Sequence, residues 1–198
     1  MPLAFVNNAR VLFIHIPKTG GSSVERYLSD HGPMLLKGNG RAAGLRCSAQ
    51  HLHAEALASM EADKGCDFTF TIVRHPVARL VSEYSYQMRK PGWLRQRLSF
   101  PAWLSYAFAR HAIDPYYRDN HFRPQHEFIL PATHIMRFED GIDACLRRIG
   151  EQLGIAPPST TIHEKPSPRK DIRLSSAALR KIERVYERDL ELFGYEIG

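Results

Sequence analysis

The chain has 198 residues, of which 43% are hydrophobic and 24% charged, proportions typical of a globular protein and unlike a disordered or fibrous one. A net charge of +6 favours anionic partners. No apolar run approaches the ~18 residues that a membrane span needs. Cys47, Cys66 and Cys145 form no CxxC pair, which argues against structural zinc and for a reducing compartment. We therefore expect one soluble domain over residues 1–198, located in the cytoplasm.

Two short apolar segments, 11–16 and 68–73, are predicted to be buried strands. Both are rich in β-branched and aromatic residues and too short for helices. Each precedes a helical pattern, and the second pattern, over 77–88, begins directly after Pro76, a residue suited to the first position of a helix. Their hydrophobicity is continuous rather than alternating, which predicts a sheet covered on both faces.

A third strand is predicted at 134–138, followed by a helix with apolar residues between positions 142 and 153. The last helix is expected to begin near Ser175, because serine is a favoured N-cap. Alternating strands and helices predict an α/β fold: a three-layer, P-loop-like domain with a central parallel sheet flanked by helices. The segments 38–45 and 157–173 are predicted to be loops.

The sharpest local feature lies between the first strand and its helix. Glycines there let several backbone N–H groups point into one concavity, and the N-terminus of the helix attracts anions. Lysine precedes the glycines, unlike the GxxxxGK[ST] loop, so an ATPase or GTPase is disfavoured. The alternative is a plain strand-to-helix turn with an exposed lysine. The residues predicted to hold an anion are Pro17, Lys18, Thr19, Gly20, Gly21, Ser22 and Ser23.

A second anion-binding feature follows the strand at 68–73. Arg74 stands at the carboxyl end of that strand, where open α/β sheets bind ligands, and Ser82 lies about two helical turns later. An arginine and a hydroxyl suit a second phosphate. Taken alone, the pair is a weak signal, better explained by an arginine in a surface ion pair and a serine on a solvated helix face.

Together the two motifs resemble the signatures of sulfotransferases that use 3′-phosphoadenosine 5′-phosphosulfate (PAPS). The closer resemblance is to the carbohydrate branch, which includes the heparan sulfate and dermatan/chondroitin sulfate uronyl 2-O-sulfotransferases. Its members show a PKTG[GS][ST]S loop, a GH segment, an FxxVRxPxxRxxSxY segment and a downstream RPQ. This chain has the corresponding segments at 17–23, 50–51, 70–84 and 123–125, in that order. It departs from the pattern at Gln50, where the family has glycine.

The resemblance implies PAPS as the sulfuryl donor, PAP as its product, a hydroxyl acceptor on a saccharide and no metal. The loop 17–23 corresponds to the segment that holds the 5′-phosphosulfate, and Arg74 and Ser82 to the segment that holds the 3′-phosphate. Lys18 is then expected to balance charge on the leaving phosphate. His51 aligns with the family's catalytic histidine and is the expected base.

Histidine is the side chain whose ordinary pKa lies nearest neutrality, which suits a general base. Without the resemblance, His51 could not be ranked above His53 or His75, and His53 stays the alternative base. His15 is expected to be a hydrogen-bonded core residue.

Several other polar residues could take part in the chemistry. Glu25 and Glu55 fit solvated helix faces better than the role of a base. His121 and His126 flank the 123–125 segment and are hypothesised to line the acceptor side.

The segment 89–124 holds seven Lys or Arg residues against two Asp, together with eight aromatic residues. Arginine pairs with carboxylate and sulfate, and aromatic faces suit sugar rings, so this segment is the expected acceptor-binding region. The loop 164–170 either closes over the adenosine or 3′-phosphate of the donor or is simply solvated. No nucleic acid is expected as a partner, and contact with a membrane surface stays open.

Two other functions compete with sulfuryl transfer. A kinase-like phosphotransferase would use the same anion-binding loop, but the Walker lysine is missing and no aspartate that could bind Mg²⁺ obviously follows a strand. A non-catalytic protein that binds nucleic acid or acidic glycan through 89–124 would show a steep salt dependence and no turnover.

Overall fold

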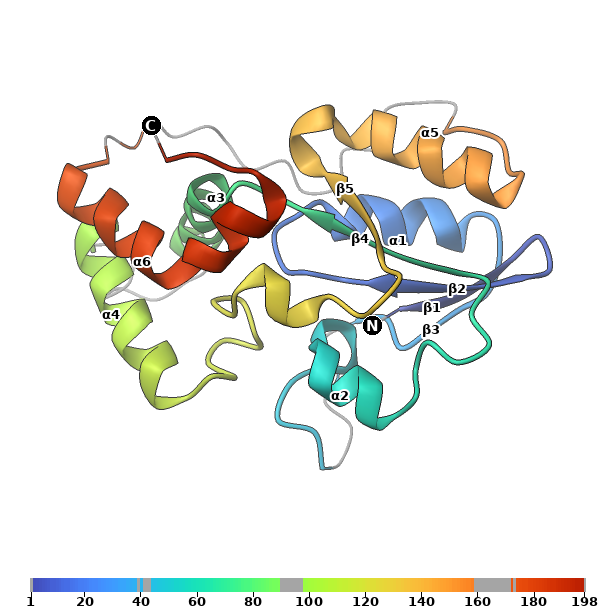
Figure 1. Cartoon of the computed structure of the whole chain (residues 1–198), viewed down its shortest axis with the longest axis horizontal. Coiled ribbons are helices and arrows are strands. Elements are labelled where there is room, and N and C mark those ends of the chain that lie inside the picture. The colour runs from blue at the N-terminus through green and yellow to red at the C-terminus, as the bar shows by residue number, and fades with distance from the viewer. Residues whose placement is uncertain are drawn as a thin grey trace.

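The computed structural model describes residues 2–38, 40, 44–89, 98–158, 172 and 174–197. Its centre is a five-stranded sheet with the strand order β3-β1-β2-β4-β5 (Figure 1). β2, β4 and β5 are parallel, whereas β1 is antiparallel to both of its neighbours. The strands are β1 (Leu3–Val6), β2 (Ala9–Ile14), β3 (Met34–Leu35), β4 (Phe68–Val73) and β5 (His134–Arg137).

Helices cover both faces of this sheet. The α-helices are α1 (Gly21–Ser29), α2 (Ala54–Ser59), α3 (Pro76–Met88), α4 (Phe100–Ile113), α5 (Ile142–Leu153) and α6 (Ser176–Phe193). The short 3₁₀ segments are η1 (Ala49–His51), η3 (Gln125–Phe128) and η4 (Phe138–Asp140). α1 and α5 lie on one face, and α2, η3 and the end of α6 pack on the other (Figure 1). The predicted three-layer α/β fold is confirmed.

The alternation of side chains along β2 explains the two cores. Val11 and Phe13 pack toward α1 and α5, while Leu12 and Ile14 pack toward α2 and η3. All four side chains are fully buried. The continuous apolar run is therefore a strand covered on both faces, as predicted from the sequence.

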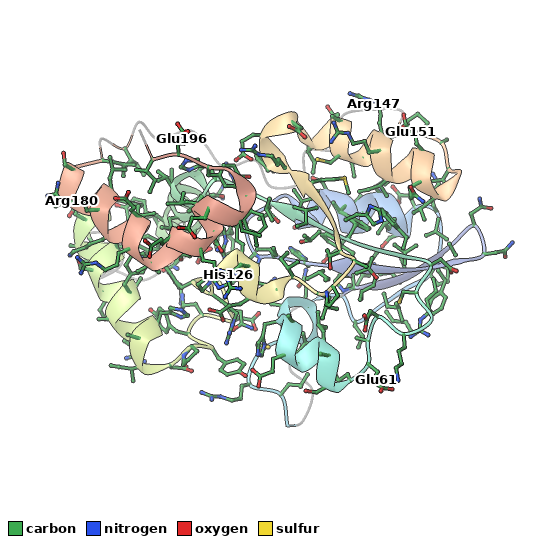
Figure 2. The ribbon with its side chains drawn as sticks, in the orientation of Figure 1. Glu61, His126, Arg147, Glu151, Arg180 and Glu196 are labelled. Carbon is green, nitrogen blue, oxygen red and sulfur yellow. The ribbon has the colours of Figure 1, made fainter. Side chains whose placement is uncertain are left out.

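A third core lies beyond the carboxyl ends of the parallel strands. There α3, α4 and α6 pack together around buried aromatic residues such as Trp103, Phe122 and Tyr186 (Figure 1). Arg147 and Glu151 on α5 and Arg180 on α6 are exposed on the outer faces of their helices (Figure 2). These helices are thus amphipathic, with charge toward solvent.

The N-terminal hairpin is the main difference from the predicted fold. β1 and β2 are joined by Asn7 and Asn8, whose φ angles of 48° and 64° are left-handed, as a two-residue hairpin turn requires. The sheet is therefore mixed rather than wholly parallel. The strand predicted at 11–16 occupies 9–14, because the chain leaves the sheet before Pro17.

The other predicted elements begin where the sequence places them. Pro76 is the first residue of α3, and the N–H of Val77 donates to Nδ1 of His75 at 3.2 Å. Ser175 is the N-cap of α6, and its side chain accepts from the N–H of Ala178 at 3.3 Å. The loop 164–170, most of 157–173 and part of both 38–45 and 89–124 lie outside the described residues.

Candidate active site

The loop between β2 and α1 turns sharply in two left-handed steps. Lys18 has φ +70° and Gly20 has φ +90°, and Gly20 is the N-cap of α1. Thr19 is buried, and its hydroxyl donates to the carbonyl of Ile16 at 2.9 Å, so this side chain closes the turn. The turn brings the backbone of the predicted anion loop to the N-terminus of α1.

The start of α1 packs directly on His15. A Cβ atom added to Gly21 would lie 2.2 Å from Nε2 of His15, so only glycine fits at this position. The next residue, Ser22, is half-buried, whereas Ser23 is buried and its N–H donates to the carbonyl of Gly20 at 3.0 Å. The imidazole of His15 therefore lies beneath the predicted anion loop.

Arg74 brings the second predicted motif against the first. Its Nη1 donates to the carbonyl of Lys18 at 3.2 Å, and its guanidinium lies 4.2 Å above the ring of Phe138. Its Nε is buried and has no hydrogen-bond partner among the residues that the structure describes. Burial lowers the pKa of this guanidinium. Ser82, also predicted to bind phosphate, is buried in the second turn of α3.

The glutamine of the 123–125 segment fixes the backbone of Arg74. Oε1 of Gln125 accepts from the Arg74 N–H at 2.9 Å, and Nε2 donates to the Arg74 carbonyl at 2.8 Å. The N–H of Gln125 in turn donates to Asp189 at 2.7 Å. This two-point contact holds the carboxyl end of β4 in place.

Arg79 also belongs to the site, although no role was predicted for it from the sequence. It is 1% exposed; its Nε donates to the carbonyl of Pro17 and its Nη2 to the carbonyl of His121, both at 3.1 Å. One guanidinium thus joins the anion loop to the segment around residue 121. The sequence signal for this role was the position of Arg79 within the 70–84 motif.

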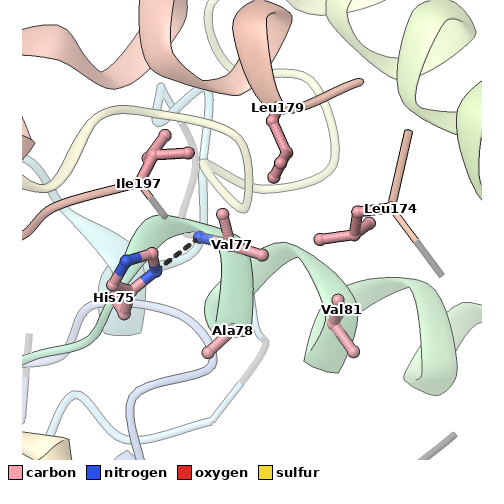
Figure 3. Close-up of a pocket in the computed structure, with 7 residues that line it drawn as sticks. All are labelled: His75, Val77, Ala78, Val81, Leu174, Leu179 and Ile197. Atoms are coloured by element: carbon pink, nitrogen blue, oxygen red, sulfur yellow. Dashed lines mark hydrogen bonds between the residues drawn. The ribbon is translucent and has the colours of Figure 1, made fainter. Parts of the chain in front are cut away.

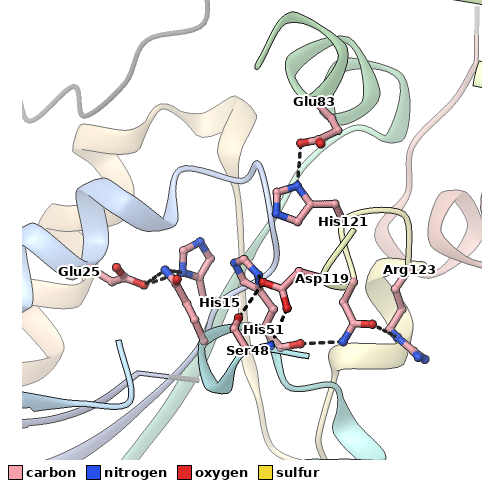
Figure 4. A network of polar contacts seen from close by, with 10 residues as sticks. His15, Glu25, Ser48, His51, Glu83, Asp119, His121 and Arg123 are labelled. Carbon is pink, nitrogen blue, oxygen red and sulfur yellow. Dashed lines mark hydrogen bonds and ion pairs between the residues drawn. The ribbon is translucent and has the colours of Figure 1, made fainter. Parts of the chain in front are cut away.

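Three histidines stand in a row next to this loop, each edge-on to the next (Figure 4). The ring centroids of His15 and His51 are 5.1 Å apart, and those of His51 and His121 are 5.2 Å apart. Every one has a carboxylate at its Nδ1, so Nε2 is the ring atom left for a second contact. The pairs are His15 with Glu25 at 2.6 Å, His51 with Asp119 at 2.8 Å and His121 with Glu83 at 2.7 Å.

The central histidine, His51, is buried and uncharged. Burial lowers its pKa to about 3, so the ring is neutral at neutral pH. Burial alone would raise the pKa of Asp119, but hydrogen bonds from His51 and from Ser48 outweigh it and hold that pKa below its usual range. The N–H and hydroxyl of Ser48 donate to Asp119 at 2.5 and 2.7 Å.

Asp119 reaches His51 from a left-handed turn made without glycine. Arg118, Asp119 and Asn120 have φ angles of 56°, 61° and 63°. Each such residue costs roughly 1–2 kcal/mol. Side-chain hydrogen bonds oppose this strain, because Asn120 donates to the carbonyl of His51 at 2.8 Å and Arg123 donates to Asn120 at 3.1 Å.

The alternative base, His53, lies outside the row. It is buried at the N-cap of α2, its ring is edge-on to Tyr116 at 5.5 Å, and its Nε2 is 3.7 Å from Glu55. Glu55 has a largely exposed side chain, as predicted. His126 pairs with Asp189 at 2.7 Å.

Glu25 corrects a prediction, because it is not on a solvated face. Its side chain is 15% exposed and accepts hydrogen bonds from His15 and, at 2.5 Å, from Gln50. The side chain of Gln50 therefore points into the interior beneath the loop. Burial lowers the pKa of His15, which is a hydrogen-bonded core residue as predicted.

An apolar pocket of about 350 Å³ opens beside the start of α3 (Figure 3). It offers hydrophobic surface with His75 as its one strongly polar side chain, so it is a different kind of site from the anion loop. Its lining is His75, Val77, Ala78, Val81, Leu174, Leu179 and Ile197.

Within the described ranges, no group of three or more His, Cys, Asp or Glu side chains could hold a metal ion.

A family model described as "Sulfotransferase family" matches residues 3–196. The chain belongs to the sulfotransferase family. It is thus an enzyme of sulfuryl transfer, and of the three functions considered from the sequence the sulfotransferase is confirmed. Membership in the family implies PAPS as the donor and a hydroxyl as the acceptor.

A solved sulfotransferase from Alicyclobacillus acidocaldarius shares the fold of this sulfotransferase, with a TM-score of 0.55. The two chains are 19% identical, and the comparison covers 94% of this chain and 96% of the other. Among curated proteins, no sequence matches the chain significantly. None of the helices in the described part of the chain is both long and apolar enough to cross a membrane.

Proposed function

We propose that this enzyme transfers the sulfuryl group of PAPS to a hydroxyl of a saccharide by in-line displacement, within one domain over residues 1–198. His51 is the base and Lys18 balances the charge of the leaving phosphate. The observation that carries this proposal is the stacking beneath the loop. His15 packs on Gly21 and is edge-on to His51, so the proposed base lies one ring away from the predicted anion loop.

The residues at the two motifs fit an anionic donor. Residues Pro17, Lys18, Thr19, Gly20, Gly21, Ser22 and Ser23 would hold the 5′-phosphosulfate, and Arg74 and Ser82 the 3′-phosphate. The unpartnered, buried Nε of Arg74 supports this assignment, because an unsatisfied guanidinium nitrogen suits an anionic ligand. No metal is required, since Lys18 and the N-terminus of α1 supply positive charge.

Each residue of the proposed site then has one task. Asp119 holds the Nδ1–H of His51, so that Nε2 removes the proton of the acceptor hydroxyl as the hydroxyl oxygen bonds to sulfur. The donor supplies the sulfuryl group, whose bond to the bridging oxygen breaks while the 5′-phosphate keeps the electron pair. Lys18 stabilises the charge that develops there, and the loop positions the reacting atoms in line.

The saccharide acceptor is inferred from the resemblance to the carbohydrate branch, which is carried by the segments at 17–23, 50–51, 70–84 and 123–125. The departure at Gln50 leaves this inference standing, because its side chain bonds to Glu25 in the interior. We infer a cytoplasmic setting from the three cysteines, all of which are free thiols.

Calorimetric titration of the purified protein with PAP tests the proposal, with ATP and GTP as controls. The expected result is PAP binding well above either nucleotide, because only PAP presents a 3′-phosphate to Arg74 and Ser82. Labelled PAPS would then be used to screen saccharides against alcohols that are not sugars. A folded sample that does not bind PAP would overturn the proposal.

A further inference from the structure

The third histidine of the row differs from the second in the carboxylate that it faces. Glu83 is 2% exposed in the middle of α3, and it accepts hydrogen bonds from His121 at 2.7 Å and from Gln87 at 2.6 Å. Gln87 is itself fixed, because Trp103 donates to its Oε1 at 3.1 Å. A carboxylate this deeply buried is strongly unfavourable unless a cation faces it.

His121 and Lys18 are the cations placed to balance Glu83. Burial alone would raise the pKa of Glu83, but the charge and hydrogen bond of His121, the hydrogen bond of Gln87 and the charge of Lys18 together lower it. Lys18 Nζ lies 4.2 Å above the ring of Tyr86, which follows Glu83 by three residues on the same helix. The buried carboxylate of Glu83 thus has two side chains near it that can carry positive charge, His121 and Lys18.

Asp119, the carboxylate that faces His51, has different hydrogen-bond donors from Glu83. Asp119 receives an N–H and an O–H from Ser48, so its charge is well solvated while His51 stays neutral. Glu83 receives an amide from Gln87, and its other oxygen faces His121. Asp119 thus receives two neutral donors from Ser48, whereas Glu83 receives the Gln87 amide and the His121 imidazole.

We propose that His121 is a second cationic contact of the donor site: an imidazolium held by Glu83, whose Nε2–H binds the sulfuryl or 5′-phosphate oxygens beside Lys18. Arg79 places it there, since one guanidinium binds the carbonyls of both Pro17 and His121. The proton stays on His121 throughout, so the chemical step at His51 is unchanged. This inference rests on the proposed use of PAPS.

Several titratable or charged groups surround His121, and they decide the sign of the pH dependence. Glu83 favours its charged form, whereas the others oppose it or are neutral. They are Glu83 and Arg79 from α3, Lys18 from the loop, His51 from η1 and, beyond His51, His15 from the end of β2. An anion bound next to His121 adds to the effect of Glu83, so the donor and a proton on His121 should bind cooperatively.

The test is PAP calorimetry on wild-type protein and on His121→Gln from about pH 5 to about pH 9, which covers the ordinary histidine range and its alkaline side. Each pH is measured in two buffers of different ionisation enthalpy, which gives the number of protons taken up on binding. Wild-type protein is expected to take up a proton toward the alkaline end, a step that His121→Gln lacks. The variant should also bind PAP roughly 10- to 100-fold more weakly near neutral pH. Titration of the PAP phosphates cancels in the comparison at each pH.

The matched control is His126→Gln, because His126 has the same 16% side-chain exposure and also pairs with a buried carboxylate, Asp189. It should keep the wild-type proton uptake. Glu83→Gln is a second variant and should also lose the uptake, since the neutral amide no longer holds a charged ring. Equal uptake in wild-type protein and both site variants would overturn the role of His121, whereas absence of PAP binding to folded wild-type protein would overturn the proposed function itself.

Discussion

The site is built from two turns that reach left-handed backbone in different ways. The loop at 17–20 combines a lysine with a glycine, and Gly20 has φ +90°. The turn at 118–120 uses three successive residues with side chains, all at positive φ. In the first turn one of the two left-handed positions is a glycine, whereas in the second none is and hydrogen bonds with Ser48, His51 and Arg123 hold the side chains.

This difference explains which of the two turns can be recognised from a short stretch of sequence. Arg79 joins the two turns through the carbonyls of Pro17 and His121. The loop can be recognised as a local motif, but the turn exists only because Ser48, His51 and Arg123 hold its side chains. Backbone strain of this kind is typical of functional sites, where it fixes the direction of a side chain such as Asp119.

Among substitutions in the two turns, the largest effect is expected from Lys18→Ala, which removes the proposed charge from the loop. Turnover of PAPS should fall by roughly 10³-fold or more, because stabilisation of the leaving phosphate is lost. The thermal unfolding curve should stay close to that of the wild type. Lys37→Ala is the control, since Lys37 is exposed and its Nζ donates to Ser29. Normal turnover in Lys18→Ala would exclude the proposed role of the lysine.

Asp119→Asn tests the other turn and should reduce kcat by roughly 10²-fold. The amide nitrogen would face Nδ1 of His51 and favour the tautomer in which Nε2 carries the proton, so the base is blocked. PAP affinity, measured by calorimetry, should change little. Asp114→Asn is the matched control, because Asp114 pairs with the exposed Arg46. An unchanged kcat would show that Asp119 does not set the tautomer.

A pair of backbone substitutions compares the turns directly. Gly20→Ala should lower the free energy of unfolding by at least about 1–2 kcal/mol, since a side chain is forced into left-handed backbone and its Cβ would lie 3.0 Å from Cδ1 of Ile142. Arg118→Gly should change it by less than about 1 kcal/mol, because the relief of strain is offset by the greater freedom of the unfolded chain. Urea denaturation measures both, and an equal loss in the two variants would contradict the distinction.

Acid should lower the stability of the folded chain through His51 and Asp119. The folded pKa of His51, about 3, lies below its ordinary value of 6.5, so the unfolded chain binds more protons between these values. The pKa of Asp119 is also lowered, so its stabilisation is lost as the pH falls below the ordinary value. The free energy of unfolding should therefore decrease steadily below about pH 6.5. Denaturation curves at several pH values measure this decrease. A free energy of unfolding that does not change with pH would contradict the prediction.

The sequence predicted the parts of the molecule that depend on neighbouring residues. Periodicity and caps identified β4, α3, β5, α5 and α6, and the glycines identified the turn between β2 and α1. The β1–β2 hairpin was missed although Asn7 and Asn8 form its turn.

The carboxylates of the site were beyond local patterns, since each meets its histidine only in the folded chain. Asp119 is 68 residues from His51, and Glu83 is 38 residues from His121. Glu25 was misread because its position on α1 fits a solvated face, and only the packing of His15 and Gln50 buries it.

The proposed mechanism depends most on His51 as the base between the two turns. The variant His51→Ala tests this role directly. PAP binding and sulfuryl transfer should be measured on the same preparation, with His53→Ala beside it. We predict that His51→Ala binds PAP with near wild-type affinity and has no measurable turnover, while His53→Ala keeps both. Continued turnover in His51→Ala, or its loss in His53→Ala alone, would contradict the account.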